Sequence, residues 1–189
     1  MRILNFDEFN EEKLQLIESI KDGAVFIYPT DTVYGIGCNA LNSKSVKKIR
    51  ELKGRPTNPF SVIVPSKDWI HENCIVNNEA EEWIKKLPGP FTLILKLKNK
   101  KCVSKEVNSN LDTLGVRIPG NWIRNFVSEL GIPIITTSVN KSSEPYMTNL
   151  EDLDDSIKAG VDFMIYEGEK KAKPSRIIDL SGKFKIIER

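Results

Sequence analysis

Histidine and cysteine are scarce in this chain of 189 residues. There is one histidine, His71, and the three cysteines, Cys38, Cys74 and Cys102, lie far apart with no CxxC pair. A single histidine excludes a His-rich metal site, and an odd number of scattered cysteines does not make a disulfide framework. We therefore expect free thiols in a reducing compartment and no metal site built by the protein itself.

Long apolar runs are also absent. No stretch approaches the roughly 20 apolar residues that a membrane helix needs. The first residues, MRILNFDE, carry acid where a signal peptide would be apolar. These features predict a cytoplasmic protein with no membrane association.

The glycine fingerprints of common nucleotide-binding loops are missing, since neither GxxxxGK[ST] nor GxGxxG occurs. No internal repeat, low-complexity tract or Pro/Gly/Ser linker divides the chain, so we predict one domain over residues 1–189. The net charge is +2, from 28 basic and 26 acidic side chains. This balance does not by itself argue for a nucleic-acid partner.

Hydrophobic periodicity predicts helices and strands that alternate early, with strands dominating late. The predicted helices span residues 7–21, 43–52, 78–87, 121–130 (capped by Asn121) and 149–159. The predicted strands span residues 24–28, 60–64, 91–97, 114–118, 132–136, 161–166, 176–180 and 184–187, and the polar residues 99–112 are expected to form a loop or lid. This order predicts an α/β domain with a mixed, twisted sheet and helices packed on it.

Two polar segments follow predicted elements and are candidate ligand sites. The run YPTDTVYGIG, residues 28–37, places two threonines, an aspartate and two glycines after a buried strand. Its hydroxyls and backbone N–H groups suit a small polar ligand or phosphate, and an ordinary strand–turn is the alternative. The run KGRPTNP, residues 53–59, holds Lys53 and Arg55 between prolines. Such cations can bind phosphate oxygens, and a solvated basic loop without a ligand is the alternative.

Two further candidates lie at later strands. Arg117 stands in the otherwise apolar strand LGVRI, where a buried guanidinium needs an anion. A ligand carboxylate or phosphate would satisfy it, and so would an internal Asp or Glu. Ser138 and Asn140 follow the strand at 132–136 and are two residues apart, so they can project together. Capping and turn chemistry uses the same residue types and is the alternative there.

Six motifs together make the chain resemble the YrdC/TsaC family of threonylcarbamoyl-AMP synthases over essentially its whole length. They are PTDTVYG at 29–35, KxR at 53–55, LPGPFT at 87–92, GVRIP at 115–119, SxN at 138–140 and PSxIID at 174–179. The resemblance implies an open, cupped α/β domain of the YrdC-like fold with a positively charged central cleft. It also implies a nucleotidyltransferase that makes threonylcarbamoyl-AMP and pyrophosphate from L-threonine, bicarbonate or CO2, and ATP. Mg²⁺ is expected to accompany ATP, and downstream proteins to transfer the threonylcarbamoyl group to tRNA.

The resemblance also implies roles for single residues. It assigns the ATP phosphates and catalysis to Lys53, Arg55, Ser138 and Asn140. It places Asn58, Thr113 and Arg189 on the nucleotide side, and it places Thr32, Arg117, Thr136 and Ser175 around threonine.

The chain departs from the commonest family pattern at two positions. Many relatives have a histidine in the strand after KxR, where this chain has PFSVIV, and residue 176 is Arg where threonine is common. The chain also resembles the short family form without a second C-terminal domain. A weak RNA-binding module without its own turnover is one alternative function, because residues 44–55 carry six basic side chains. A carbamoyl-transferring domain of metallocentre maturation is another, although the zinc-type cysteine clusters of such proteins are missing.

Overall fold

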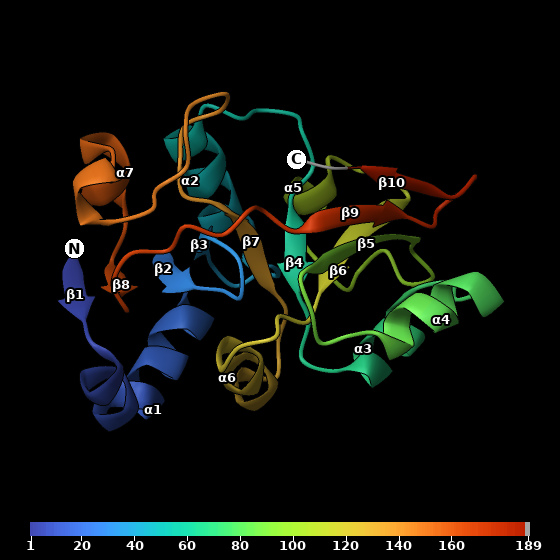
Figure 1. Ribbon diagram of the computed structural model, residues 1–189, viewed down its shortest axis with the longest axis horizontal. Helices are drawn as coiled ribbons and strands as arrows, with labels where there is room; N and C mark the ends of the chain where they lie inside the picture. The colour runs from blue at the N-terminus through green and yellow to red at the C-terminus, as the bar shows by residue number, and fades with distance from the viewer. Residues whose placement is uncertain (188–189) are drawn as a thin grey trace.

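Ten strands form one open, mixed sheet in the computed structural model, which describes residues 1–187 (Figure 1). The order across the sheet is β1-β8-β2-β3-β7-β4-β6-β5-β9-β10. The strands are β1 (Arg2–Leu4), β2 (Phe26–Pro29), β3 (Tyr34–Gly37), β4 (Ser61–Ile63), β5 (Phe91–Lys96), β6 (Thr113–Arg117), β7 (Ile134–Ser138), β8 (Phe163–Ile165), β9 (Arg176–Asp179) and β10 (Lys185–Ile187). The pairs β1/β8, β2/β8, β4/β6 and β5/β9 are parallel and the others antiparallel, so the predicted fold class is confirmed.

The helices pack on both faces of the sheet. They are α1 (Phe6–Asp22), α2 (Ser43–Lys53), α3 (Lys67–Asn73), α4 (Asn78–Lys85), α5 (Lys105–Asn108), α6 (Ile123–Leu130) and α7 (Asp155–Gly160), with a 3-10 turn at Leu150–Asp152. Figure 1 shows α1 and α6 together on one side of β2, β3 and β7, with α2 and α7 on the other.

Two hydrophobic cores lie on opposite faces because successive side chains of a strand point in opposite directions. In β2, Phe26 and Tyr28 pack into the core under α1 and α6, whereas Ile27 packs into the larger core under α2 and α7. In β7, Ile134 belongs to the first core and Ile135 to the second. The central strands β2 and β7 therefore contribute apolar side chains to both cores.

The first helix shows how the sequence sets these elements. Asn5 accepts hydrogen bonds from the backbone N–H groups of Asp7 and Glu8, and the Glu8 carboxylate accepts one from the Asn5 N–H. This reciprocal cap satisfies N–H groups that have no partner inside the helix. The buried face of α1 carries Phe9, Leu16, Ile17 and Ile20.

Several predicted elements differ from the structure. Residues 34–37, expected in a polar ligand segment, form β3, and residues 2–4 form a strand that was not predicted. Residues 105–108 of the expected loop form α5, and the helix expected at 149–159 is interrupted at Leu153. Asn121 does not cap α6: the helix begins at Ile123 with Trp122 at the cap position, and the Asn121 side-chain amide donates to the Pro29 carbonyl while its Oδ1 atom accepts no hydrogen bond from residues 1–187.

The cysteine prediction is confirmed, since Cys38, Cys74 and Cys102 are free and buried. Burial raises the pKa of the Cys102 thiol to about 11, so it stays protonated near neutral pH. Within residues 1–187, no helix has the length and apolar character needed to cross a membrane.

Candidate functional site

The turn between β2 and β3 places two threonines at the centre of the sheet. Thr30 Oγ1 donates to the Val33 carbonyl and accepts from the Thr32 N–H, and the two threonine hydroxyls lie 3.0 Å apart. These bonds close a tight turn and fix the direction of both side chains. The chain then returns as β3, so the motif at 29–35 forms an antiparallel hairpin rather than a free loop.

The glycines of this hairpin are explained by packing. Tyr28 lies beneath β3 and donates its hydroxyl to the Ile135 carbonyl. A Cβ atom at Gly37 would lie 2.2 Å from the Ile135 carbonyl oxygen and 2.9 Å from the Tyr28 ring. Both interpretations of residues 28–37 therefore hold in part. The glycines allow close packing of the strands, and the threonines face a pocket.

The pocket beside the hairpin has about 500 Å³ of empty space, including its open mouth, and we call it the hydroxyl pocket. Its polar lining comes from Thr30, Thr32, Tyr34, Ser61, Thr92, Arg117, Thr136, Thr137, Ser138 and Ser175. The strands β3, β4, β5, β6 and β7 and the segment before β9 all contribute. The structure thus brings together the four residues expected around threonine, and it adds Ser138 from the expected phosphate set.

Arg117 is the cation of this pocket and is held by an internal carboxylate. Its Nη2 atom lies 2.6 Å from Asp31 Oδ1 and 3.4 Å from Thr32 Oγ1. The other Asp31 oxygen accepts from the Gly120 N–H at 2.7 Å. Of the two alternatives for Arg117, the structure shows the internal aspartate. Its Nε atom is buried and has no acceptor among residues 1–187.

The SxN motif forms a compact cluster with Lys53. Ser138 Oγ donates to Asn140 Oδ1 at 2.7 Å, so these side chains project together as expected. Lys53 is 2% exposed, and its ammonium donates to the Ser138 and Asn140 carbonyls at 2.5 and 2.6 Å and to Asn140 Oδ1 at 3.0 Å. Burial, with a smaller contribution from Arg55, lowers the pKa of Lys53 to about 7.

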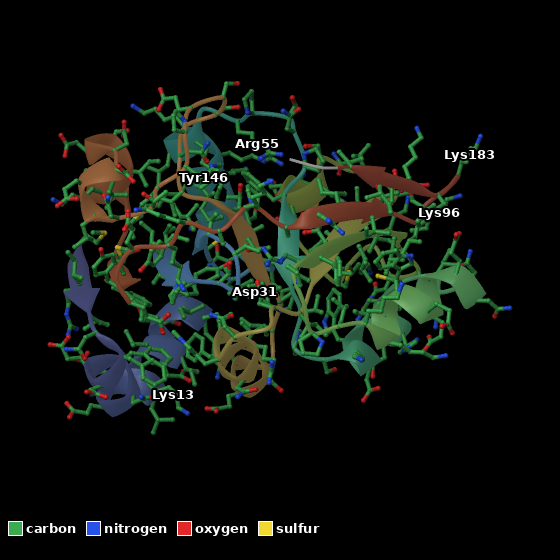
Figure 2. All side chains as sticks on the ribbon, in the orientation of Figure 1. Lys13, Asp31, Arg55, Lys96, Tyr146 and Lys183 are labelled. Atoms are coloured by element: carbon green, nitrogen blue, oxygen red, sulfur yellow. The ribbon has the colours of Figure 1, made fainter. Side chains whose placement is uncertain are left out.

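Arg55 and Asn58 of the expected nucleotide side lie in the loop at residues 53–59, which we call the basic loop. Arg55 is half-buried, donates to the Pro59 carbonyl at 2.8 Å and lies over the Phe60 ring at 5.2 Å. Asn58 is exposed, and Thr113 is half-buried at the start of β6. Figure 2 shows Arg55 beside α2 and Asp31 nearer the middle of the molecule. Arg189 lies outside the described residues.

Several pocket residues were not predicted as site residues. Ser61 and Thr92 stand in apolar strands, and Thr92 Oγ1 lies 2.9 Å from Ser175 Oγ. A hydroxyl inside an apolar strand is the signal that would have found both of them. Asp31 belongs to the candidate segment at 28–37, but nothing in the sequence pairs it with Arg117, which is 86 residues away.

The charged side chains do not gather into a metal-binding group. Within residues 1–187, no three His, Cys, Asp or Glu side chains come together in a way that could hold a metal ion. His71 is exposed on α3, with its Nε2 atom 3.6 Å from Glu81.

Comparison with known proteins agrees with this arrangement. The sequence model of the Sua5/YciO/YrdC family, described as telomere recombination, matches residues 18–189. A putative threonylcarbamoyl-AMP synthase from Methanocaldococcus jannaschii is 38% identical over 188 residues, covering 95% of this chain and 87% of that protein. A threonylcarbamoyl-AMP synthase from Pyrococcus abyssi is 34% identical over 186 residues, covering 95% of this chain and 54% of that protein. The chain thus spans about half of the Pyrococcus protein's length.

A solved structure shows the same fold. The crystal structure of P. abyssi Sua5 complexed with L-threonine superposes with a TM-score of 0.86 and 30% sequence identity, over 98% of this chain and 56% of that one. The family match covers most of the sequence, and the fold match covers nearly all of the structure. The chain therefore belongs to the Sua5/YciO/YrdC family.

Proposed function

We propose that this protein is an L-threonylcarbamoyladenylate synthase that supplies the activated intermediate for N6-threonylcarbamoyladenosine in tRNA. The observation that carries the proposal is the hydroxyl pocket, which joins a buried arginine to a wall of serine and threonine hydroxyls. This composition suits a small amino acid with a carboxylate and a hydroxyl group. Relatives named for this activity, and a family member crystallised with L-threonine, support it.

The proposed reaction joins threonine, CO2 and ATP in two bond-forming steps. The threonine nitrogen adds to CO2 and loses a proton, which gives a carbamate. A carbamate oxygen then attacks the α-phosphorus of ATP, and pyrophosphate leaves with the electrons of the broken P–O bond. Both reactants are anions, so fixed donors that hold them together lower the barrier.

The residues around the pocket divide this task in our proposal. Arg117 orients threonine through its carboxylate, because its unpaired Nε is a donor that a carboxylate can use. Arg55 stabilises the phosphates and the departing pyrophosphate. Ser138 lines the hydroxyl pocket and contacts Asn140, so the SxN cluster connects threonine to the phosphate side. Lys53 holds this cluster in place through its hydrogen bonds to the Ser138 and Asn140 carbonyls.

Mg²⁺ enters as part of the substrate in this proposal, bound to the ATP phosphates. Magnesium keeps several waters and commonly binds through substrate phosphates and one or two protein carboxylates. The described residues contain no cluster of three or more His, Cys, Asp or Glu side chains that could hold a metal ion, so we assign no protein ligand to Mg²⁺.

The test is pyrophosphate release from ATP by the purified protein, with bicarbonate present and each amino acid supplied in turn. We expect release that requires L-threonine. Arg55→Ala should lower turnover by about 10²–10³-fold, the usual effect of removing one donor to developing charge. Arg2→Ala is the matched control, because Arg2 is exposed at the edge strand β1 and pairs only with Glu12 among the partners seen. A folded wild-type protein that releases no pyrophosphate with any amino acid would contradict the proposal.

A further inference from the structure

Arg50 in α2 is buried, and its side chain donates six hydrogen bonds to residues that the structure describes. It is 8% exposed, and its guanidinium lies over the Phe60 ring at 4.6 Å. Its acceptors are the carbonyls of Arg55, Pro56, Asn58, Glu106 and Val107 and the hydroxyl of Ser109. Nearly all of the partners are backbone carbonyls, so Arg50 holds the path of the chain.

The acceptors belong to two separate segments. Nη1 of Arg50 donates to three carbonyls of the basic loop, at 2.8 Å for Arg55, 3.1 Å for Asn58 and 3.2 Å for Pro56. Nε and Nη2 donate to the α5 segment, at 2.8 Å for the Glu106 carbonyl and 3.3 Å for the Val107 carbonyl. One planar guanidinium thus connects residues 55–58 to residues 106–109.

Two other bonds join the same segments. Ser109 Oγ donates to the Thr57 carbonyl, and the Phe60 N–H donates to the Val107 carbonyl at 2.8 Å. Ser109 and Asn110 both have positive φ, at 54° and 63°, which is uncommon for serine and more readily adopted by asparagine. The segment expected to form a loop or lid is therefore attached to the basic loop through residues 107 and 109.

We propose that Arg50 is a positioning residue for the nucleotide, because it fixes the basic loop against α5 and so sets where Arg55 and Asn58 are presented. The inference rests on the proposed function for the identity of the ligand, ATP. A guanidinium suits this role because its donors point in fixed directions, whereas a lysine ammonium is a single point of charge.

The proposal predicts a split between the two substrates. Arg50 donates to the basic loop and the α5 segment, whereas the hydroxyl pocket is lined by other elements, the β2–β3 turn, the strands β3–β7 and the segment before β9. A loosened basic loop should weaken ATP binding and leave threonine binding as it was. A residue that supports only overall stability would change both substrates alike or neither.

The first variant is Arg50→Lys, which keeps the positive charge and removes the planar guanidinium with its several N–H donors. We expect the KM and Kd for ATP to rise about tenfold, as the loss of one or two net hydrogen bonds would produce, with the KM for L-threonine within about twofold of wild type. Lys47→Met is the matched control, because it removes a charge one turn earlier on α2 and its side chain is exposed with only a 3.7 Å pairing to Glu106. Its ATP dependence should equal wild type.

Amide hydrogen exchange provides a readout that needs no turnover. In Arg50→Lys, exchange should accelerate in residues 54–60 and 105–110 and stay unchanged in β3 and β7. Ser109→Ala, a mild change at the surface, should produce a smaller acceleration in the same two segments, so the inference can be tested even if Arg50→Lys folds poorly.

Two results would overturn the inference: wild-type exchange and ATP affinity in Arg50→Lys, or equal rises in the KM of both substrates. Failure of the proposed function is a different outcome. It would appear as a wild-type protein that neither binds ATP nor releases pyrophosphate, whatever the exchange data show.

Discussion

The hydroxyl pocket and the basic loop both contain buried polar side chains, but they use them differently. In the hydroxyl pocket, hydroxyls pair with one another, as Thr30 does with Thr32 and Thr92 with Ser175. In the basic loop and its support, Lys53 and Arg50 donate to backbone carbonyls. Hydroxyl pairs can exchange partners when a ligand binds. A buried cation that donates to backbone carbonyls instead stabilises the fold. A cation within a phosphate-type motif is therefore not necessarily a phosphate ligand.

The largest expected effect comes from the ion pair between Arg117, which lines the hydroxyl pocket, and Asp31. Arg117→Met should lower the free energy of unfolding by about 3–5 kcal/mol, because it leaves Asp31 nearly buried without its cation. Urea denaturation measures this loss. The double variant Arg117→Met with Asp31→Asn is the control and should recover part of the loss, since it removes the unpaired charge. A loss below about 1 kcal/mol for the single variant would mean that solvent or another group replaces Arg117.

Lys53→Met tests how much the buried Lys53 ammonium at the start of the basic loop stabilises the fold. The variant leaves the carbonyls of Ser138 and Asn140 without their donor, so the free energy of unfolding should fall by about 2 kcal/mol. The loss should also depend on pH. The pKa of Lys53 is about 7 in the folded chain and 10.5 ordinarily, so the unfolded chain binds more protons between these values.

The sign of this pH effect follows from proton linkage. The penalty for burying the Lys53 charge is complete below about pH 7 and disappears as pH rises toward 10.5. The stability of wild type relative to Lys53→Met should therefore increase between pH 7 and 9, on the order of 1–2 kcal/mol. Comparing the two proteins at each pH cancels the titration of other groups. A constant difference from pH 6 to 9 would show that the three acceptors keep Lys53 charged.

The smallest expected effect lies in the wall of the hydroxyl pocket. Ser175→Ala removes one member of the pair with Thr92 and should raise the KM for L-threonine about fivefold, equivalent to about 1 kcal/mol, without changing the KM for ATP. Steady-state kinetics with each substrate varied separately measures this. Thr92→Val should give a similar effect, and the double variant should add little to either. A rise in the KM for ATP instead would place Ser175 on the nucleotide side.

The sequence predicted the elements and the convergence of the pocket better than the pairing of its charges. Apolar periodicity located β2, β4 and β7 to within a few residues but missed β3, and the four residues assigned to threonine line one pocket. The partner of Arg117 was left open, because it depends on which strands become neighbours in space. Burial of Lys53 was also missed, since its surroundings come from a segment about 85 residues away in the sequence.

Short-range expectations failed where a tertiary partner was stronger than the local one. Asn121 has the right chemistry for a helix cap, but α6 begins at Ile123, and the Asn121 amide donates to the Pro29 carbonyl. Residues 105–108 lack a long apolar period, yet they form a helical turn that is fixed from outside by Arg50. Tertiary contacts of this kind cannot be read from a window of neighbouring residues.

The close contact between Gly37 and the Ile135 carbonyl has a consequence for how the site can diversify. The floor of the pocket at Gly35 lies on the buried Tyr28 ring, and an added Cβ atom at Gly37, two residues along β3, would meet the Ile135 carbonyl oxygen of β7. The walls are side chains from five strands that can be replaced one at a time. Substitutions that change substrate preference are therefore open at the walls and closed at the floor. The fold sets the depth of the pocket, and single mutations can adjust its lining.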